Sequence, residues 1–232
     1  MYKKFLEGEL VALCVPEEKA IGEDLWHQWF NDVDRHAATQ HAIFPNHEST
    51  QREILQSLAG DKSRVTLLIT GTDGLKASGV ISLQNIDFRV RSAEIAIIMS
   101  SSSRTELPRL SALEAMALLT EHGFVSLGLD RIYAGQAYPL LASWNKALEL
   151  IGYKTEGLSR GAFVRGHSVQ DIVSITCHYD VATQIIHRRG SLWGDTSKIK
   201  SAMKRQPKAG FADSLDSVLR EMSDEHYSFL ER

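Results

Sequence analysis

The pattern of apolar and polar positions over the first 60 residues predicts one strand and two helices. Residues 10–15 form a short apolar run that ends at Pro16, which is typical of a strand. Residues 23–31 carry leucine, tryptophan and phenylalanine at helical spacing, and residues 49–59 begin with Ser-Thr, as a capped helix does. The polar, histidine-rich segment between these helices, residues 32–47, is predicted to be a loop.

The next apolar segments predict strands that are joined by turns. Residues 65–69, 79–86 and 93–99 are apolar and rich in β-branched side chains. Residues 71–74, Gly-Thr-Asp-Gly, have the composition of a tight turn, and the alternation over residues 87–92 indicates a hairpin connection. We therefore expect these strands to lie side by side in an antiparallel sheet.

Helices and strands alternate over the following 80 residues. Pro108 suits the opening turn of a helix that runs to Phe124, and residues 143–150 predict another helix. Residues 131–134 and 172–177 are predicted to be strands. The elements do not follow a regular βαβ repeat, so the pattern predicts an α+β fold.

The character of the chain changes after Asp180. Seven lysines or arginines stand between Arg188 and Lys208 against a single acid, Asp195. Apolar residues then recur at helical spacing, at Phe211, Leu215, Val218, Leu219 and Met222. We therefore divide the chain into residues 1–180 and a C-terminal extension, residues 181–232, made of a basic linker and an amphipathic helix. The apolar stripe of that helix is expected to cover its own core or to form a homodimer.

Composition narrows the classes of partner. The chain has 232 residues, 43% of them hydrophobic, and a net charge of −3, which argues against a nucleic-acid partner. No apolar run is long enough to cross a bilayer, so no membrane partner is expected. The two cysteines show neither metal-type nor paired spacing, and the spacing of His36, His41 and His47 matches no compact metal site. We expect a cytoplasmic protein without a metal.

Short motifs carry a resemblance to a known superfamily. They are Gly-Val-Ile-Ser-Leu at 79–83, Ala-Glu-Ile-Ala-Ile at 93–97, Glu-Ala at 114–115, His-Gly-Phe at 122–124, Leu-Gly-Leu-Asp-Arg-Ile at 127–132 and Leu-Glu-Leu-Ile-Gly-Tyr-Lys-Thr-Glu-Gly at 148–157. In the order and spacing of these motifs, the sequence from residue 10 to 179 resembles the GNAT acyltransferases, especially the branch of ribosomal-protein, spermidine and amino-sugar N-acetyltransferases. The resemblance implies that residues 1–180 are a GNAT-like domain, with a central, mostly antiparallel mixed sheet flanked by helices. It implies transfer of an acetyl or other short acyl group to an amine.

The resemblance also implies acetyl-CoA as the co-substrate and indicates where it binds. A pantetheine arm is a chain of amides, which an opened strand edge can bind as an added strand. A pyrophosphate is bound by backbone N–H groups at a helix start. The residues expected to do this are Ile97, Ile98 and Met99 for the arm, and Arg104, Arg109, Leu110, Ser111 and Ala112 for the phosphates.

The phosphate segment departs from the family pattern, which is Gln or Arg, two residues, Gly, one residue, then Gly or Ala. Residues 107–112 are Leu-Pro-Arg-Leu-Ser-Ala, so only Ala112 fits, and Leu110 stands in place of the first glycine. The charges of Arg104 and Arg109 are expected to compensate. Two further family positions, a tyrosine and an asparagine, correspond to Leu148 and Leu141 here.

Amide formation needs an unprotonated amine, because an alkylammonium with a pKa of about 10.4 has no lone pair. Glu94 is the candidate base, since it is the lone carboxylate in an apolar strand. Its alternative is a structural ion pair with Arg89 or Arg91. Tyr138 is the candidate acid for the leaving thiolate, with a surface or core aromatic as its alternative.

The loop that follows the first helix is expected to cover the acceptor, with substrate contacts from Trp26, Asp32, His36 and His41. The leading hypothesis is an N-acetyltransferase that acts on a small-molecule amine, such as an amino sugar or a polyamine, by direct attack. One alternative is a GNAT-fold module that binds acyl-CoA or a partner without transfer activity. The other is a protein N-terminal or lysine acetyltransferase.

Overall fold

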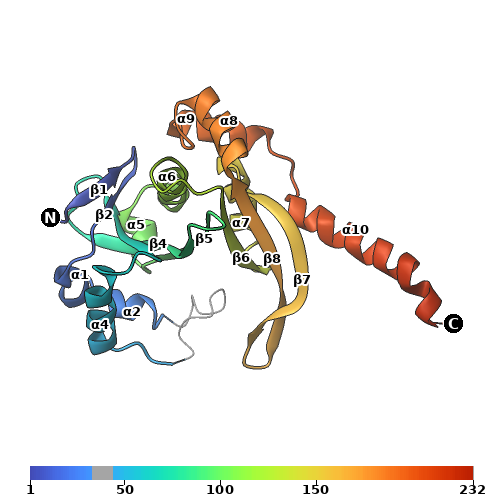
Figure 1. Ribbon diagram of the computed structural model, residues 1–232, viewed down its shortest axis with the longest axis horizontal. Coiled ribbons are helices and arrows are strands. Elements are labelled where there is room, and N and C mark those ends of the chain that lie inside the picture. Colours follow the sequence, from blue (N-terminus) through green and yellow to red (C-terminus); the bar gives the residue numbers. More distant parts are fainter. Residues whose placement is uncertain (33–43, 232) are drawn as a thin grey trace.

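The part of the chain that the computed structural model describes, residues 1–32 and 44–231, is built around one mixed sheet of eight strands (Figure 1). The strand order is β1-β2-β3-β4-β5-β6-β8-β7, and every neighbouring pair is antiparallel except β5 and β6, which are parallel. The strands are Lys4–Glu7 (β1), Val11–Cys14 (β2), Val65–Gly71 (β3), Ala77–Asp87 (β4), Ser92–Met99 (β5), Arg131–Tyr138 (β6), Lys154–Arg165 (β7) and Ser168–His178 (β8).

Helices cover both faces of this sheet. In Figure 1, α6 lies on one face, whereas α1, α2 and α4 lie on the other. The helices are Glu18–Gly22 (α1), Trp26–Trp29 (α2), Glu48–Leu58 (α4), Ser103–Glu106 (α5), Ser111–Val125 (α6), Ala142–Leu148 (α7), Tyr179–Arg189 (α8), Thr196–Arg205 (α9) and Phe211–His226 (α10). Two short 3₁₀ turns, Glu149–Ile151 and Tyr227–Glu231, follow α7 and α10.

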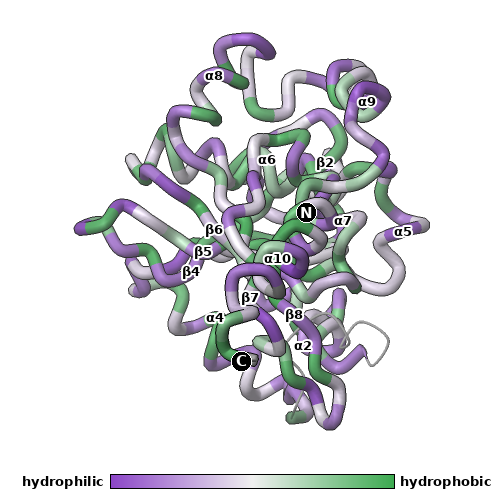
Figure 2. Tube along the Cα trace, turned by 90° about the vertical axis from the view of Figure 1, so that its right-hand side faces the viewer, coloured by the Kyte–Doolittle hydropathy of each residue, from purple (hydrophilic) through white to green (hydrophobic). Residues whose placement is uncertain are grey.

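Each face of the sheet has its own apolar core, because alternate residues of a strand point to opposite sides. On β5, Ala93 and Ile95 belong to the large cluster beneath α6, and we call this side the α6 face. Ile98 packs against a second cluster, which contains Trp26 and Trp29 of α2, and we call this side the α2 face. Hydrophobic segments accordingly concentrate in the middle of the molecule, and the outer helix α9 is hydrophilic (Figure 2).

A buried carboxylate fastens the N-terminal hairpin to α6. Glu114 is fully buried and accepts hydrogen bonds from the backbone N–H groups of Glu9 (2.6 Å), Leu10 (2.7 Å) and Val11 (2.9 Å). The chain can approach this closely because Gly8 has no side chain: a Cβ there would lie 2.7 Å from the Glu114 carboxyl carbon. Glu114, part of a motif that the sequence singled out, therefore holds the first turn of the sheet.

The sheet parts between β5 and β6. Their parallel register covers three residue pairs and ends where Glu94 lies beside Tyr133. Beyond this point β5 continues to pair with β4, and β6 continues to pair with β8 as far as Tyr138. The two strands therefore separate toward their C-terminal ends, which places an open strand edge in the centre of the sheet.

The C-terminal extension packs on the same core as the rest of the chain. Leu192, Trp193 and Ile199 are buried in the cluster beneath α6. The indole N–H of Trp193 and the backbone N–H and hydroxyl of Thr196 all donate to Oε2 of Glu9, at 3.0, 2.7 and 2.9 Å. Only α10 projects away from the body (Figure 1).

The structure confirms the predicted α+β fold, with its mostly antiparallel mixed sheet and C-terminal helix. Four local expectations differ from the structure. The predicted helix over residues 23–31 contains only the four-residue α2, with α1 before it, and the segment expected to be a basic linker contains α8 and α9. The long strand β7 was missed, and β6 extends four residues beyond the predicted end, to Tyr138.

Candidate active site

The open edge of β5 offers backbone groups to a ligand. The N–H of Ser100 donates to the C=O of Ser78 on β4 (2.8 Å). Along a strand, the backbone groups of alternate residues point to the same neighbouring strand, so those of Ile98, two residues earlier, also point to β4. The backbone groups of Ile97 and Met99 are directed to the opposite edge, which faces β6. Two of the three predicted pantetheine residues thus have the required orientation, whereas the backbone of Ile98 is used within the sheet.

The start of α6 has the local geometry of an anion site. Leu110, its N-cap residue, adopts φ 76° and ψ 0°, a left-handed conformation that favours glycine. The N–H of Ala112 lies in the first helical turn, where the helix provides no carbonyl for it. Arg104 and Arg109 are exposed, and neither forms an ion pair with another described residue. Backbone N–H donors and two arginines are therefore present in the segment that the sequence predicts to bind the phosphates.

Two buried polar side chains, one at the start of α6 and one on α7, lack partners within the described structure. The hydroxyl of Ser111 is buried at the first residue of α6, and both polar atoms of the Asn145 side chain are buried on α7. Buried polar groups are nearly always hydrogen-bonded, because an unpaired one costs about 1–3 kcal/mol. Such orphaned groups are expected where a polar ligand supplies the missing partners, so the residues present fit a ligand with amides and phosphates.

Glu94 lies on the α2 face, at the point where β5 and β6 separate. Its carboxylate accepts a hydrogen bond from the side-chain amide of Asn85 (3.2 Å). The arginines proposed as alternative partners are engaged elsewhere, because Arg89 pairs with Asp87 and Arg91 pairs with Asp130. The structure therefore leaves the Glu94 carboxylate half-exposed, with no cation from its own hairpin.

Tyr138 lies far from Glu94 and on the other face of the sheet. It is five residues beyond Tyr133, which is about 16 Å along a strand, and it packs against the cluster beneath α6. Its hydroxyl donates to Oδ1 of Asp213 on α10 (2.8 Å). Burial and this acidic partner raise the pKa of Tyr138 to about 12. The structure does not bring Tyr138 and Glu94 together.

A polar row that the sequence did not reveal crosses the α2 face. Tyr133 lies between its register partners Glu94 on β5 and Thr176 on β8. Oε2 of Glu156 accepts from the Thr176 hydroxyl (2.7 Å), and Oε1 lies 2.7 Å from Nε2 of His178. The hydrogen bonds from His178 and Thr176 lower the pKa of Glu156. This arrangement coincides with a register shift in β7 between residues 155 and 157. No pattern in the sequence predicts this shift.

Known structures share this architecture. Spermidine N-acetyltransferase from Vibrio cholerae, solved with CoA and spermine, superimposes with a TM-score of 0.64 over 75% of this chain and 98% of that one, at 16% identity. Mycobacterium smegmatis RimJ, solved with CoA-disulfide, gives a TM-score of 0.63 over 77% of this chain and 88% of that one, at 18% identity. The fold is that of the GNAT acetyltransferases. No protein-family model and no curated protein matches the sequence.

Within this fold, the three positions that depart from the family pattern have structural counterparts. Leu110 keeps the left-handed backbone that a glycine would adopt at the phosphate segment, even though it carries a side chain. Leu148, at the family's tyrosine position, is fully buried in the core and has no polar function. Leu141 is the half-buried N-cap residue of α7, and the orphaned Asn145 lies one helical turn further on.

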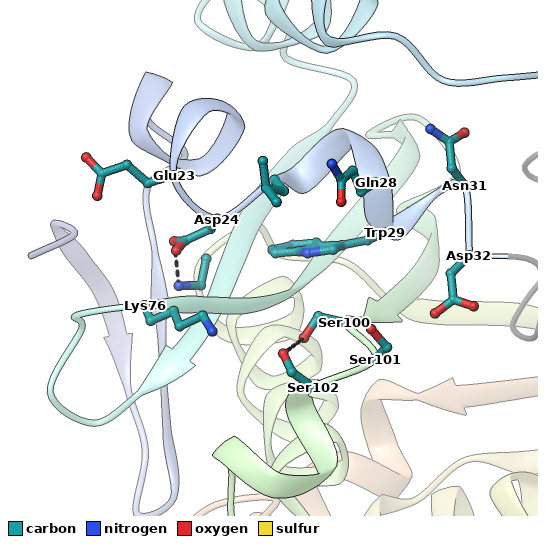
Figure 3. Close-up of a pocket in the computed structure, with 12 residues that line it drawn as sticks. Glu23, Asp24, Gln28, Trp29, Asn31, Asp32, Lys76, Ser100, Ser101 and Ser102 are labelled. Atoms are coloured by element: carbon teal, nitrogen blue, oxygen red, sulfur yellow. Dashed lines mark hydrogen bonds between the residues drawn. The ribbon is translucent and has the colours of Figure 1, made fainter.

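A cavity of about 510 Å³ opens beside α2, at the far end of β5 from Glu94 (Figure 3). Trp29 lies in its centre, with Asp32 and Asn31 to one side and Asp24 and Lys76 to the other. Trp26, predicted to contact substrate, is instead buried in the core of the α2 face and does not line the cavity. His36 and His41 lie outside the described residues.

The cavity and Glu94 are separate places on the GNAT fold. Ser100, which lines the cavity, is six residues from Glu94, or about 20 Å along a strand. Asp32 and Glu94, both predicted to serve the acceptor, are thus not brought together in the described part of the structure. Among the described residues, no group of three or more His, Cys, Asp or Glu side chains could hold a metal ion, and no helix is long and apolar enough to cross a membrane.

Proposed function

We propose that the protein transfers an acetyl or other short acyl group from acyl-CoA to a primary amine. The observation that carries this proposal is the separation of β5 from β6, which opens a strand edge beside the polar row. The start of α6, which has the geometry of an anion site, follows β5 in the sequence. An extended amide chain is complementary to such an edge, and a pyrophosphate is complementary to such a helix start. The structural relatives, which were solved with CoA or a CoA derivative, support the same ligand.

The co-substrate has a set of residues suited to each of its parts. The backbone groups of Ile97 and Met99 would bind the amides of the pantetheine arm. The first turn of α6, from Ser111 onward, would bind the pyrophosphate with help from Arg104 and Arg109. The orphaned side chain of Asn145 would gain a polar partner on the α7 side.

Glu94 is the proposed base for the amine. A primary ammonium must lose a proton before its nitrogen can attack the thioester carbonyl. The Glu94 carboxylate lies where the two strands part, on the side away from α6, and is free of the arginines of its hairpin. The backbone N–H groups at the strand edge would stabilise the oxyanion of the tetrahedral intermediate.

The proposed acceptor is a small-molecule amine, such as an amino sugar or a polyamine. The cavity beside α2 has three carboxylates, Glu23, Asp24 and Asp32, against one cation, Lys76, which is paired with Glu106 at 2.5 Å. The negative charge of this cavity and the Trp29 ring suit a cationic group, either on a small-molecule acceptor or on a peptide that carries the reacting amine. A protein N-terminus or lysine is the alternative acceptor, because the same chemistry serves both.

A second candidate function, binding of acyl-CoA without transfer, is favoured by Leu110. A side chain at the closest approach to the phosphates would weaken the cofactor site, and Leu148 supplies no acid. A binding module would retain acetyl-CoA without releasing free CoA in the presence of amines. The Glu94 carboxylate, which forms no ion pair with the arginines of its hairpin, favours the enzyme.

Calorimetric titration with acetyl-CoA, CoA and dephospho-CoA tests the proposal. We expect saturable binding of acetyl-CoA that Arg109→Glu weakens at least tenfold, because a cation near a phosphate is replaced by an anion. Arg64→Glu is the matched control, since it makes the same charge change at a residue just before β3, outside the predicted phosphate segment. Absence of binding at millimolar acetyl-CoA would overturn the proposal.

We further propose that α10 pairs with a second copy of the chain in the cytoplasm. Val218, Leu219 and Met222 on α10 are exposed, and a groove of about 570 Å³ between α10 and β7 is lined in part by Leu158 and Tyr227. An apolar helix face of this kind is stabilised by burial against another subunit. Met222→Glu is expected to convert a dimer to a monomer in size-exclusion chromatography with light scattering.

A further inference from the structure

Five of the six tyrosines in this chain are unsuited to donate a proton at the parting of β5 and β6. Three of them have hydroxyls engaged elsewhere: Tyr2 with Asp24 (2.5 Å), Tyr138 with Asp213 (2.8 Å) and Tyr153 with Thr120 (2.6 Å). The other two lie outside the sheet, because Tyr179 begins α8 and packs its ring edgewise on Phe124, and Tyr227 follows α10. The sixth is Tyr133.

The two cysteine thiols are not suitable proton donors at this place either. Cys14 and Cys177 are both buried, and burial raises the pKa of the Cys177 thiol to about 12. The hydroxyl of Thr176, the neighbour of Tyr133 on β8, is not better placed, because it already donates to Glu156. Tyr133 is therefore the remaining tyrosine, and it lies on the face that carries Glu94.

Tyr133 lies directly beside Glu94. The two residues are register partners at the last paired position of β5 and β6, so their backbones are about 4.8 Å apart and their side chains rise from the same face. The guanidinium of Arg131 lies over the Tyr133 ring, 5.2 Å from its centroid, and this contact helps to orient the ring. A base and a hydroxyl thus stand together where the strands open.

We propose that Tyr133 protonates the thiolate that leaves during acyl transfer, and that it forms a proton-exchanging pair with Glu94. This inference rests on the proposed acyltransferase function. Once Glu94 has passed the ammonium proton to solvent, the neutral amine nitrogen forms a bond to the thioester carbonyl carbon, and the second proton that this nitrogen loses passes to the Glu94 carboxylate. As the carbon–sulfur bond breaks, the hydroxyl proton of Tyr133 passes to sulfur, which gives CoA thiol.

The adjacency of the two residues closes the proton cycle. After transfer, Glu94 holds one proton too many and Tyr133 one too few. Return of that proton from the Glu94 carboxyl to the Tyr133 phenolate, directly or through one water, restores both groups. The net reaction consumes the amine and the thioester and releases the amide and CoA, and no other proton donor is required.

The decisive experiment compares three tyrosine-to-phenylalanine variants of the full chain. Tyr133→Phe removes the proposed donor, and Tyr138→Phe removes a hydroxyl from the same strand but on the opposite face. Tyr179→Phe is a remote control. Release of free CoA thiol from acetyl-CoA is measured with spermidine, glucosamine and a lysine-containing peptide as acceptors, and acetyl-CoA affinity is measured by calorimetry.

We expect kcat to fall roughly 10- to 100-fold in Tyr133→Phe, with unchanged acetyl-CoA affinity, because the variant lacks the hydroxyl that donates the proton to sulfur. Tyr179→Phe is expected to match the wild-type protein. Wild-type activity in Tyr133→Phe, or the same loss in Tyr138→Phe, would overturn the inference while leaving the acyltransferase function intact. A wild-type protein inactive with all three acceptors would overturn that function, and this inference with it.

Discussion

The hydroxyl of Tyr138 donates a hydrogen bond to Oδ1 of Asp213, 2.8 Å away, and so joins the end of β6 to the first turn of α10. The link spans 75 residues of sequence. A second contact lies close by, where Arg160 of β7 pairs with Asp171 at 2.8 Å and also with Asp216 of α10. The projecting helix is therefore fixed at its base to β6 and β7.

Removal of the Tyr138 hydroxyl should loosen this attachment. We expect Tyr138→Phe to lower the free energy of unfolding by about 1 kcal/mol, the usual contribution of one hydrogen bond, and to speed trypsin cleavage after Arg205 and Lys208, which precede α10. The pKa of Tyr138 is raised from 10.0 to about 12, so its contribution is complete below pH 10 and is lost as the pH rises through 12. Faster tail cleavage at pH 11 to 12 in the wild type, absent in the variant, would show this dependence. Equal cleavage at all pH values would contradict it.

The left-handed Leu110 gives a prediction about cofactor affinity. A non-glycine residue in this conformation costs roughly 1 kcal/mol, and we expect the side chain, although it packs against the core, to hinder close approach of a phosphate. We expect Leu110→Gly to tighten CoA binding by roughly three- to tenfold, with little net change in stability, since the lost packing offsets the relieved strain. Leu110→Asn, which tolerates the backbone but keeps a side chain, is the control and should not bind CoA more tightly. Calorimetry of both variants decides, and equal affinities would argue against close phosphate approach.

The alternation of apolar residues was sufficient to predict most of the sheet and the positions of Glu94 and α6. Strands 65–69, 79–86 and 93–99 each pack one or both faces on a core, so their hydrophobic pattern is strong. β7 was missed for the opposite reason. Residues 154–165 are mostly exposed and include Gly157 and Gly161, so neither alternation nor β-branched content identifies them as a strand.

The identity of the residues that face one another could not be obtained from the sequence. The prediction ended β6 at residue 134, which left Tyr138 in a loop, whereas the strand continues and directs Tyr138 to the α6 face. The register that sets Tyr133 beside Glu94 joins segments 39 residues apart, and long-range pairing leaves no local signal. The orphaned Ser111 and Asn145 likewise become recognisable only when burial and missing partners are both known.

These orphaned groups predict a trade-off between stability and binding. We expect Asn145→Leu to raise the free energy of unfolding by about 1–2 kcal/mol, because it removes buried polar atoms that have no partner in the described structure, and Ser111→Ala to raise it less. Both should weaken acetyl-CoA binding severalfold. Thr120→Val is the matched control: its buried hydroxyl is bonded to Tyr153 at 2.6 Å, so it should destabilise the fold without altering affinity. Urea unfolding and calorimetry measure the two effects, and stabilised variants with unchanged affinity would exclude Ser111 and Asn145 from the site.

The last prediction concerns Glu9, which connects the first turn of the sheet to α9. Its carboxylate accepts from the indole N–H of Trp193 (3.0 Å) and from Thr196, and these hydrogen bonds lower its pKa below the ordinary 4.5. A lowered pKa means that the contribution of Glu9 to stability is present above pH 4.5 and is lost as the pH falls through the folded value. The NMR signal of the Trp193 indole N–H, assigned with Trp193→Phe, should therefore shift as the pH is lowered from 5 to 3. In Glu9→Gln the signal should not move, because an amide does not titrate, and a constant wild-type signal down to pH 3 would show that Glu9 does not hold the extension through its charge.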